Sequence, residues 1–128
     1  MKIVDLDGYG LNPGDLSWQG FEELGEFTTY DRTGDNQQKI LERIADADAV
    51  LTNKTPLNRT IIEQAPNLKY IGVLATGYNV VDVAAAKEND VIVTNIPSYS
   101  TAEVAQHTIA KLLEITNQVG LHATAVEN

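Results

Sequence analysis

Five short apolar segments alternate with five stretches of helical character, and this alternation constrains the fold more than any other feature. The apolar segments cover residues 2–6, 26–30, 49–52, 70–75 and 91–94. Strands that alternate with helices form a parallel sheet, because each helix carries the chain back across the sheet in a right-handed crossover. The sequence therefore predicts one parallel sheet with helices on both faces.

The stretches between the strands carry helix signals. Helices are expected at residues 16–24, 36–47, 58–65, 80–88 and 101–120, with N-caps at Asp15, Asp35, Asn58 and Asn79. Ser100 and Glu103 have the spacing of a capping box for the last helix. Five strands in this length predict an α/β, flavodoxin-like fold of three αβα layers, with the second strand at one edge of the sheet.

Composition limits the class of protein. A chain of 128 residues with 43% apolar residues suits a single domain over residues 1–128. The net charge of −9 argues against nucleic acid and anionic membranes as partners. Cysteine is absent, and neither a secretory signal nor a transmembrane run is present, so we expect a soluble, cytoplasmic domain.

The segment from Lys69 to Asp82 contains the most informative turn. Its apolar half, Tyr70 to Ala75, is expected to be a buried strand, and Thr76-Gly77 breaks it. Gly77 adds no Cβ and can take backbone angles closed to other residues, so a ligand could approach the main chain. Free N–H groups at a strand-to-helix turn attract anions, although many such turns hold no ligand.

Ligands of parallel α/β sheets bind beyond the carboxyl ends of the strands. The loops expected at that edge cover residues 8–10, 53–55, 75–79 and 95–99. Lys54 is predicted to be the only cation among these loops. It could meet an anion held at Thr76-Gly77.

The residues fit two other types of binding site less well. Asp5 and Asp7 at the end of the first strand suggest a Mg²⁺ site of the receiver-domain kind, but that site needs an Asp where Asn53 stands and a Lys where Asn95 stands. A flavodoxin phosphate loop would be rich in Ser and Thr, which the segment after the first strand lacks. The two histidines have no Cys or His neighbours, so no metal site is predicted.

Several spaced motifs together resemble one family. The chain is similar to the D-isomer-specific 2-hydroxyacid dehydrogenases, and most similar to their glycerate dehydrogenase (hydroxypyruvate reductase) branch. The resemblance covers about residues 2–122, and the motifs that carry it lie at residues 6–18, 52–57 (TNKTPL), 72–82 (GVLATGYNVVD), 95–101 (NIPSYST) and 104–107 (VAQH).

The resemblance implies roles for individual residues. Members of this family have two domains, and this chain resembles the N-terminal part of the substrate-binding one. The backbone of Thr76 and Gly77 would hold the carboxylate of a small 2-hydroxy or 2-keto acid, with Lys54 near it. Tyr99 would line the substrate pocket, and Thr101 would approach the nicotinamide side of the cofactor.

The family's catalytic Arg, Glu and His and its G-x-G-x-x-G fingerprint have no counterpart in this sequence. The only G-x-G, at Gly8 and Gly10, has Pro13 in the third glycine's place. No catalytic residue is therefore assigned. NAD or NADP would belong to the full-length family member, and no cofactor is expected on this chain alone.

Two functional hypotheses follow. The chain is either the substrate-binding domain of an NAD(P)-dependent oxidoreductase, inactive without its nucleotide-binding Rossmann domain, or a stand-alone or engineered flavodoxin-like scaffold without catalysis. The last helix carries more apolar residues than one buried stripe needs, among them Leu112 and Leu113. A homodimer through this C-terminal helix is expected.

Overall fold

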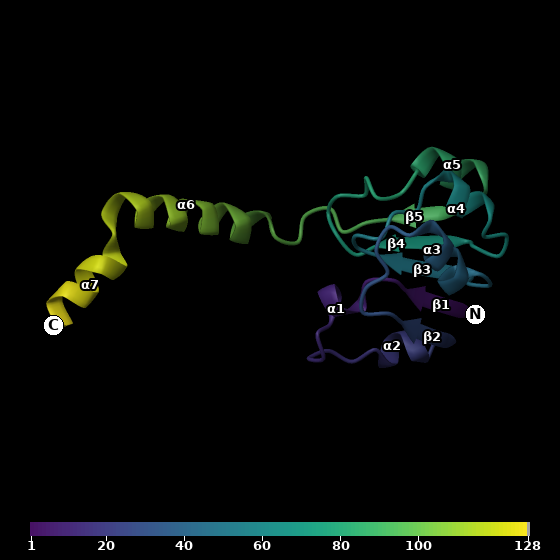
Figure 1. Ribbon diagram of the computed structural model, residues 1–128, viewed down its shortest axis with the longest axis horizontal. Helices are drawn as coiled ribbons and strands as arrows, with labels where there is room; N and C mark the ends of the chain where they lie inside the picture. The colour runs from purple at the N-terminus through teal and green to yellow at the C-terminus, as the bar shows by residue number, and fades with distance from the viewer. Residues whose placement is uncertain (128) are drawn as a thin grey trace. The chain divides into compact units, whose positions relative to one another are not determined.

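The structure is a computed structural model that describes residues 1–127 (Figure 1). It divides into two compact units, Met1–Pro97 and Ser98–Asn128. The single domain expected over residues 1–128 stays a prediction.

The first unit is built on a five-stranded sheet. Its strands are β1 (Lys2–Asp5), β2 (Glu26–Thr29), β3 (Ala49–Thr52), β4 (Tyr70–Val73) and β5 (Ile92–Thr94). They lie in the order β2-β1-β3-β4-β5, and all four neighbouring pairs are parallel (Figure 1). This order, with the second strand at one edge, confirms the flavodoxin-like α/β fold.

Helices cover both faces of this sheet. On one face, α3 (Gln37–Ile44), α4 (Arg59–Glu63) and α5 (Val83–Glu88) contribute buried residues to the main core. On the other face, a smaller cluster is centred on Ile3, Ala49 and Leu51, against which Phe21 of α2 (Gln19–Glu22) packs. Because successive strand residues point to opposite faces, β1 and β3 supply both cores.

The N-caps were predicted in part. Asn58 caps α4 as expected, since its side chain accepts a hydrogen bond of 3.1 Å from the backbone N–H of Ile61. The cap of α3 is Asn36 rather than Asp35. The prediction for α5 was wrong: its cap is Asp82, not Asn79, and the helix begins three residues later than expected.

The segment after β1 also differs from the prediction. Gly8–Leu11 forms the short helix α1, where a turn was expected. The helix expected at residues 16–24 is only the four-residue α2, and Asp15 does not cap it. The side chain of Asn12 accepts hydrogen bonds from the N–H groups of Gly14 and Leu16, which fixes a turn where the helix was expected to begin.

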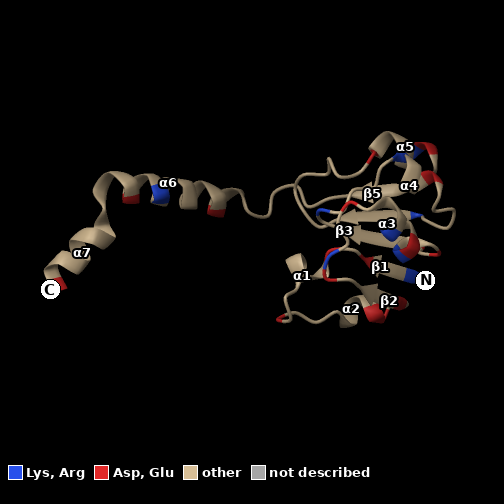
Figure 2. Cartoon of the chain, in the orientation of Figure 1, with Lys and Arg blue, Asp and Glu red and all other residues tan. Residues whose placement is uncertain are grey.

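The second unit consists of α6 (Thr101–Asn117) and α7 (Val119–Glu127). The helix predicted to reach residue 120 ends at Asn117, because Gln118 adopts a left-handed conformation with φ 48°. The side chain of Ser100 makes no capping hydrogen bond, so the predicted capping box was wrong. Charged side chains are sparse on both helices (Figure 2).

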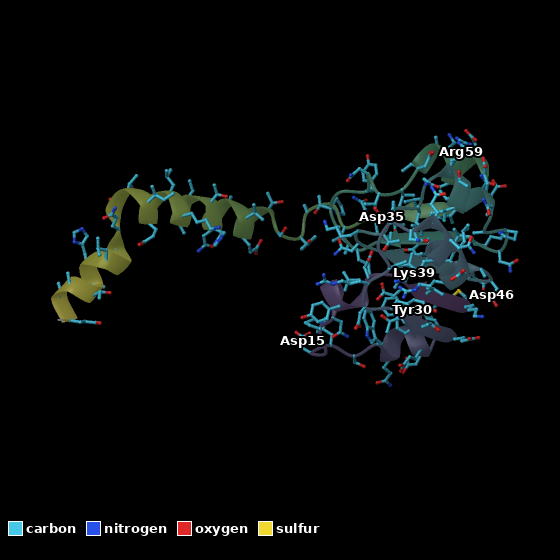
Figure 3. All side chains as sticks on the ribbon, in the orientation of Figure 1. Asp15, Tyr30, Asp35, Lys39, Asp46 and Arg59 are labelled. Atoms are coloured by element: carbon cyan, nitrogen blue, oxygen red, sulfur yellow. The ribbon has the colours of Figure 1, made fainter. Side chains whose placement is uncertain are left out.

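The first unit carries ion pairs on its surface. Lys2 pairs with Asp46 at 2.6 Å, and Arg59 pairs with Glu88 at the same distance; Figure 3 labels Asp46 and Arg59. Both pairs are solvent-exposed, and such pairs add little to stability. Within residues 1–127, no helix has the length and apolar character needed to cross a membrane.

Candidate functional site

The carboxylate of Asp7 organises the loop that follows β3. Asp7 lies two residues after β1, and its Oδ2 accepts hydrogen bonds from three successive backbone N–H groups, those of Asn53, Lys54 and Thr55, at 2.8, 2.8 and 2.9 Å. β1 and β3 are neighbours in the sheet, so their carboxyl ends bring these residues together. One side chain thereby fixes the course of the loop that carries Lys54.

Two threonine hydroxyls complete the surroundings of Asp7. Oγ1 of Thr55 donates to Oδ1 at 2.7 Å, and Oγ1 of Thr52 lies 3.2 Å from Oδ2. Burial acts to raise the pKa of Asp7, but the hydrogen bonds from the loop outweigh it, and the pKa is lowered from its ordinary value. Asp7 is therefore a buried carboxylate that is ionised at neutral pH.

The pKa of Asp5 is shifted in the opposite direction. Burial raises its pKa, although hydrogen bonds from the N–H of Asp7 and the hydroxyl of Thr29 act against this shift. Asp5 and Asp7 therefore each have partners within the protein. Among residues 1–127, no three His, Cys, Asp or Glu side chains group in a way that could hold a metal ion.

Lys54 lines a pocket of about 390 Å³ at the carboxyl edge of the sheet. The lining residues come from the loops after β1, β2 and β3: Asp7, Gly10, Asp31, Arg32, Gly34, Asn53, Lys54 and Thr55. Arg32 is a second cation here, with its guanidinium 5.3 Å from the centre of the Tyr9 ring. Lys54 is the only cation among the four loops expected at this edge, and Arg32 comes from the loop after β2, which was not among them.

Thr76 and Gly77 lie in an exposed loop after β4, and not at a helix N-terminus as predicted. Within the described part of the chain, neither backbone N–H group donates a hydrogen bond to a protein acceptor. Asn95 Nδ2 donates to the carbonyl of Thr76 at 2.8 Å and fixes that peptide group. Gly77 has no positive φ, so only its missing Cβ, and not unusual backbone angles, favours close approach of a ligand.

The structure brings some of the predicted site residues to one edge. β3 and β4 are adjacent and Thr52 pairs with Val73, so Lys54 and Thr76 follow neighbouring strand ends. The pocket that Lys54 lines does not include Thr76 or Gly77. Tyr99 and Thr101 belong to the second unit and are exposed, and their predicted roles stay predictions.

A five-stranded parallel sheet in the order β2-β1-β3-β4-β5, with helices on both faces, defines a flavodoxin-like class of domain. This chain belongs to the D-isomer specific 2-hydroxyacid dehydrogenase family, since the family's catalytic domain matches residues 11–128. The predicted resemblance is thereby confirmed.

Two relatives agree with the expected branch. Hydroxypyruvate reductase of Blautia hydrogenotrophica is 58% identical over 127 residues, which cover 98% of this chain and 39% of that protein. Glycerate dehydrogenase of Methylorubrum extorquens is 33% identical, over 98% of this chain and 38% of its own length. The chain thus spans about two fifths of the length of these relatives.

Solved structures share the fold. An acyclic imino acid reductase in complex with NADPH and D-Arg superposes with a TM-score of 0.77 at 27% identity, over 99% of this chain and 41% of that one. The NAD-dependent formate dehydrogenase of Staphylococcus aureus, in complex with NAD, gives 0.73 at 27% identity with the same coverage. Relatives of this fold therefore include enzymes that bind NAD or NADPH.

Proposed function

We propose that this chain supplies substrate-binding elements of a cytoplasmic, NAD(P)-dependent oxidoreductase that acts on D-2-hydroxy acids of the glycerate and hydroxypyruvate type. The observation that carries the proposal is the pair of unsatisfied N–H groups at Thr76 and Gly77, beside the strand end that presents Lys54. Backbone donors and an ammonium group are the partners that a small carboxylate needs.

The remaining residues have proposed roles that depend on a nucleotide-binding domain. Tyr99 lines the substrate pocket, and Thr101 at the start of α6 approaches the nicotinamide. The choice between NAD and NADP is made by residues outside this sequence, in which no G-x-G-x-x-G occurs.

Titration of the 128-residue chain with hydroxypyruvate, followed by amide chemical shifts, tests substrate binding. We expect shifts concentrated at residues 75–79 and 53–55, with an affinity no tighter than roughly millimolar because part of the pocket wall is missing. Lys54→Ala should weaken binding about tenfold, since it removes a charge-assisted hydrogen bond. Lys39→Ala, on α3, is the matched control and should bind as the unchanged chain does. Scattered shifts, or none, would contradict the proposal.

Activity is tested in a chimera. Residues 1–127 replace the matching part of the Blautia hydroxypyruvate reductase, and this chimeric protein is assayed for hydroxypyruvate reduction with NADH and with NADPH. We expect the chimera to reduce hydroxypyruvate and the 128-residue chain alone to be inactive, because this sequence holds no G-x-G-x-x-G fingerprint and no counterpart of the family's catalytic Arg and His. Turnover by the purified chain alone would overturn this part of the proposal.

A further inference from the structure

The loop at residues 53–55 has the geometry of an anion-binding site that is already occupied. Three consecutive N–H groups converge on a single oxygen atom, Asp7 Oδ2, within 2.9 Å. Successive main-chain N–H groups that converge in this way form a concavity that binds anions. The hydroxyl of Thr55 binds the other oxygen of the same carboxylate.

We propose that residues 53–55 form a carboxylate-binding loop whose ligand is Asp7 of the same chain, and that Asp7 is thereby the positioning residue for Lys54. This inference rests on the proposed function only in the role that it gives to Lys54. The loop itself is assigned from the hydrogen bonds alone.

The two loops at this edge of the sheet offer different groups to an external anion. The N–H of Lys54 is bound to Asp7, so only the ammonium group of Lys54 is available to an external anion. The N–H groups of Thr76 and Gly77 have no such partner among residues 1–127. One loop is therefore closed by an internal carboxylate and presents a cation, and the other is open and presents backbone donors.

Loss of the carboxylate would leave the loop without its common acceptor. Thr55 is buried, and buried N–H groups that lose their acceptor are costly, so the loop should open or change course. The backbone from which the Lys54 side chain extends would then no longer be held in place. A merely structural role for Asp7 would instead weaken the whole sheet, because β1 is an interior strand that pairs with both β2 and β3.

Amide hydrogen exchange separates these two outcomes. In Asp7→Ala, the amides of Asn53, Lys54 and Thr55 should exchange about tenfold faster or more, relative to the amides of β3 and β4 in the same sample. Asp46→Ala removes an exposed carboxylate from the opposite end of β1 and is the matched control, with no change at residues 53–55.

Formate provides a second readout, because it has the size of the carboxylate that Asp7→Ala removes. Added formate should restore protection at residues 53–55 in Asp7→Ala, and chloride at equal ionic strength should not. In Asp7→Asn the side-chain amide fills the space, and its uncharged oxygen is a weaker acceptor than the carboxylate. The loop should therefore lose part of its protection, and formate should not restore it. Asp7→Asn also keeps the test usable if Asp7→Ala does not fold.

The binding consequence is measured without formate, which would compete for the open loop. Asp7→Asn should weaken hydroxypyruvate binding to the 128-residue chain about as much as Lys54→Ala does. Unchanged exchange at residues 53–55 in both variants, or a change spread equally over the strands, would overturn the inference. If the exchange results hold but the unchanged chain shows no shifts with hydroxypyruvate, the loop assignment stands and the proposed function fails.

Discussion

Asp5 and Asp7 are two residues apart, yet their surroundings drive their pKa values in opposite directions. Asp7 receives hydrogen bonds from a whole loop, which stabilise its charged form. Asp5 receives two, from the N–H of Asp7 and the hydroxyl of Thr29, which do not offset its burial. Asp7 has more hydrogen-bond donors, and Asp5 is the more deeply buried of the two, so both differences separate the pKa values.

Neutralising these carboxyl groups should therefore have opposite effects at pH 7. Asp7→Asn should lower the free energy of unfolding by about 2 kcal/mol, because it removes charge-assisted hydrogen bonds and leaves buried donors unpaired. Asp5→Asn should raise the free energy of unfolding, because it removes a charge that burial disfavours. Urea denaturation of both variants measures this. A loss of stability in Asp5→Asn equal to that in Asp7→Asn would contradict the assignment.

The pH dependence of stability should show the same contrast. The pKa of Asp7 is lowered in the folded state. Its contribution to the free energy of unfolding is therefore complete above the unfolded pKa of about 3.9, and it is lost as the pH falls through the folded pKa. The folded pKa of Asp5 is raised, so its contribution is complete below the unfolded value and is lost as the pH rises through the folded pKa. Denaturation between pH 3 and 7 should show a higher free energy of unfolding for Asp5→Asn than for the unchanged chain only at the upper end of this range.

Prediction from sequence succeeded least for the roles of individual residues. Lys54, Thr76 and Gly77 were placed at the correct edge, because strand ends can be located from apolar runs. The role of Asp7 was missed, because it depends on residues more than forty positions away that only the sheet brings close. Arg32 had a usable signal, since it is a cation just after a predicted strand.

Among the helices, N-caps that make a side-chain hydrogen bond can be compared directly with one that does not. Asn58 and Asp82 cap their helices with side-chain hydrogen bonds of 3.1 and 2.8 Å, and Ser100 makes none. Asn58→Ala and Asp82→Ala should each lower the free energy of unfolding by about 1 kcal/mol, and Ser100→Ala should have almost no effect. Thermal denaturation of the three variants checks this. A loss in Ser100→Ala as large as in the others would restore the predicted capping box.

Helix α1 tolerates a side chain at one of its glycines but not at the other. A Cβ at Gly8 would collide with Oγ1 of Thr29 and lie 2.9 Å from Oδ2 of Asp5, whereas a Cβ at Gly10 would have its nearest neighbour 3.7 Å away. Gly8→Ala should therefore cost about 1–3 kcal/mol of stability. Gly10→Ala is the matched control and should be neutral or slightly stabilising. Equal urea midpoints for the two variants would contradict this packing.

The five strands and the three helices of the main core were predicted in the right order, with ends that differ by at most three residues, because their apolar residues recur at the strand or helix period. Helix α1 was not, because Gly-Tyr-Gly has little helix propensity. Its form depends on contacts from elsewhere: the N–H groups of Gly8 and Tyr9 donate to the carbonyls of Tyr30 and Asp31. Such tertiary contacts cannot be seen in a local window of sequence.

For the whole molecule, we propose that the chain self-associates through its C-terminal helices. Eight large apolar side chains of α6 and α7 are at least half exposed: Val104, Ile109, Leu112, Leu113, Ile115, Val119, Leu121 and Val126. Soluble monomers rarely leave so many apolar residues in contact with water, and a twofold dimer would cover them.

Size-exclusion chromatography with light scattering should give a dimer mass at high micromolar concentration. Leu113→Glu should shift the chain to a monomer, and Lys111→Glu, two residues away on a helix with few charges, should not. A monomer mass for the unchanged chain would rule the dimer out.

The strand order also determines how the sheet can grow during synthesis. β1 leaves the ribosome first, yet its two neighbours are β2 and β3, so Ile3 obtains its partner Ala49 only after residue 49 has emerged. Until then an apolar strand that ends up in the middle of the sheet has an unpaired edge, which invites pairing with other chains. Once β3 is in place, β4 and β5 add to one side in the order of their synthesis, so the second edge of β1 is unpaired only until β3 has emerged.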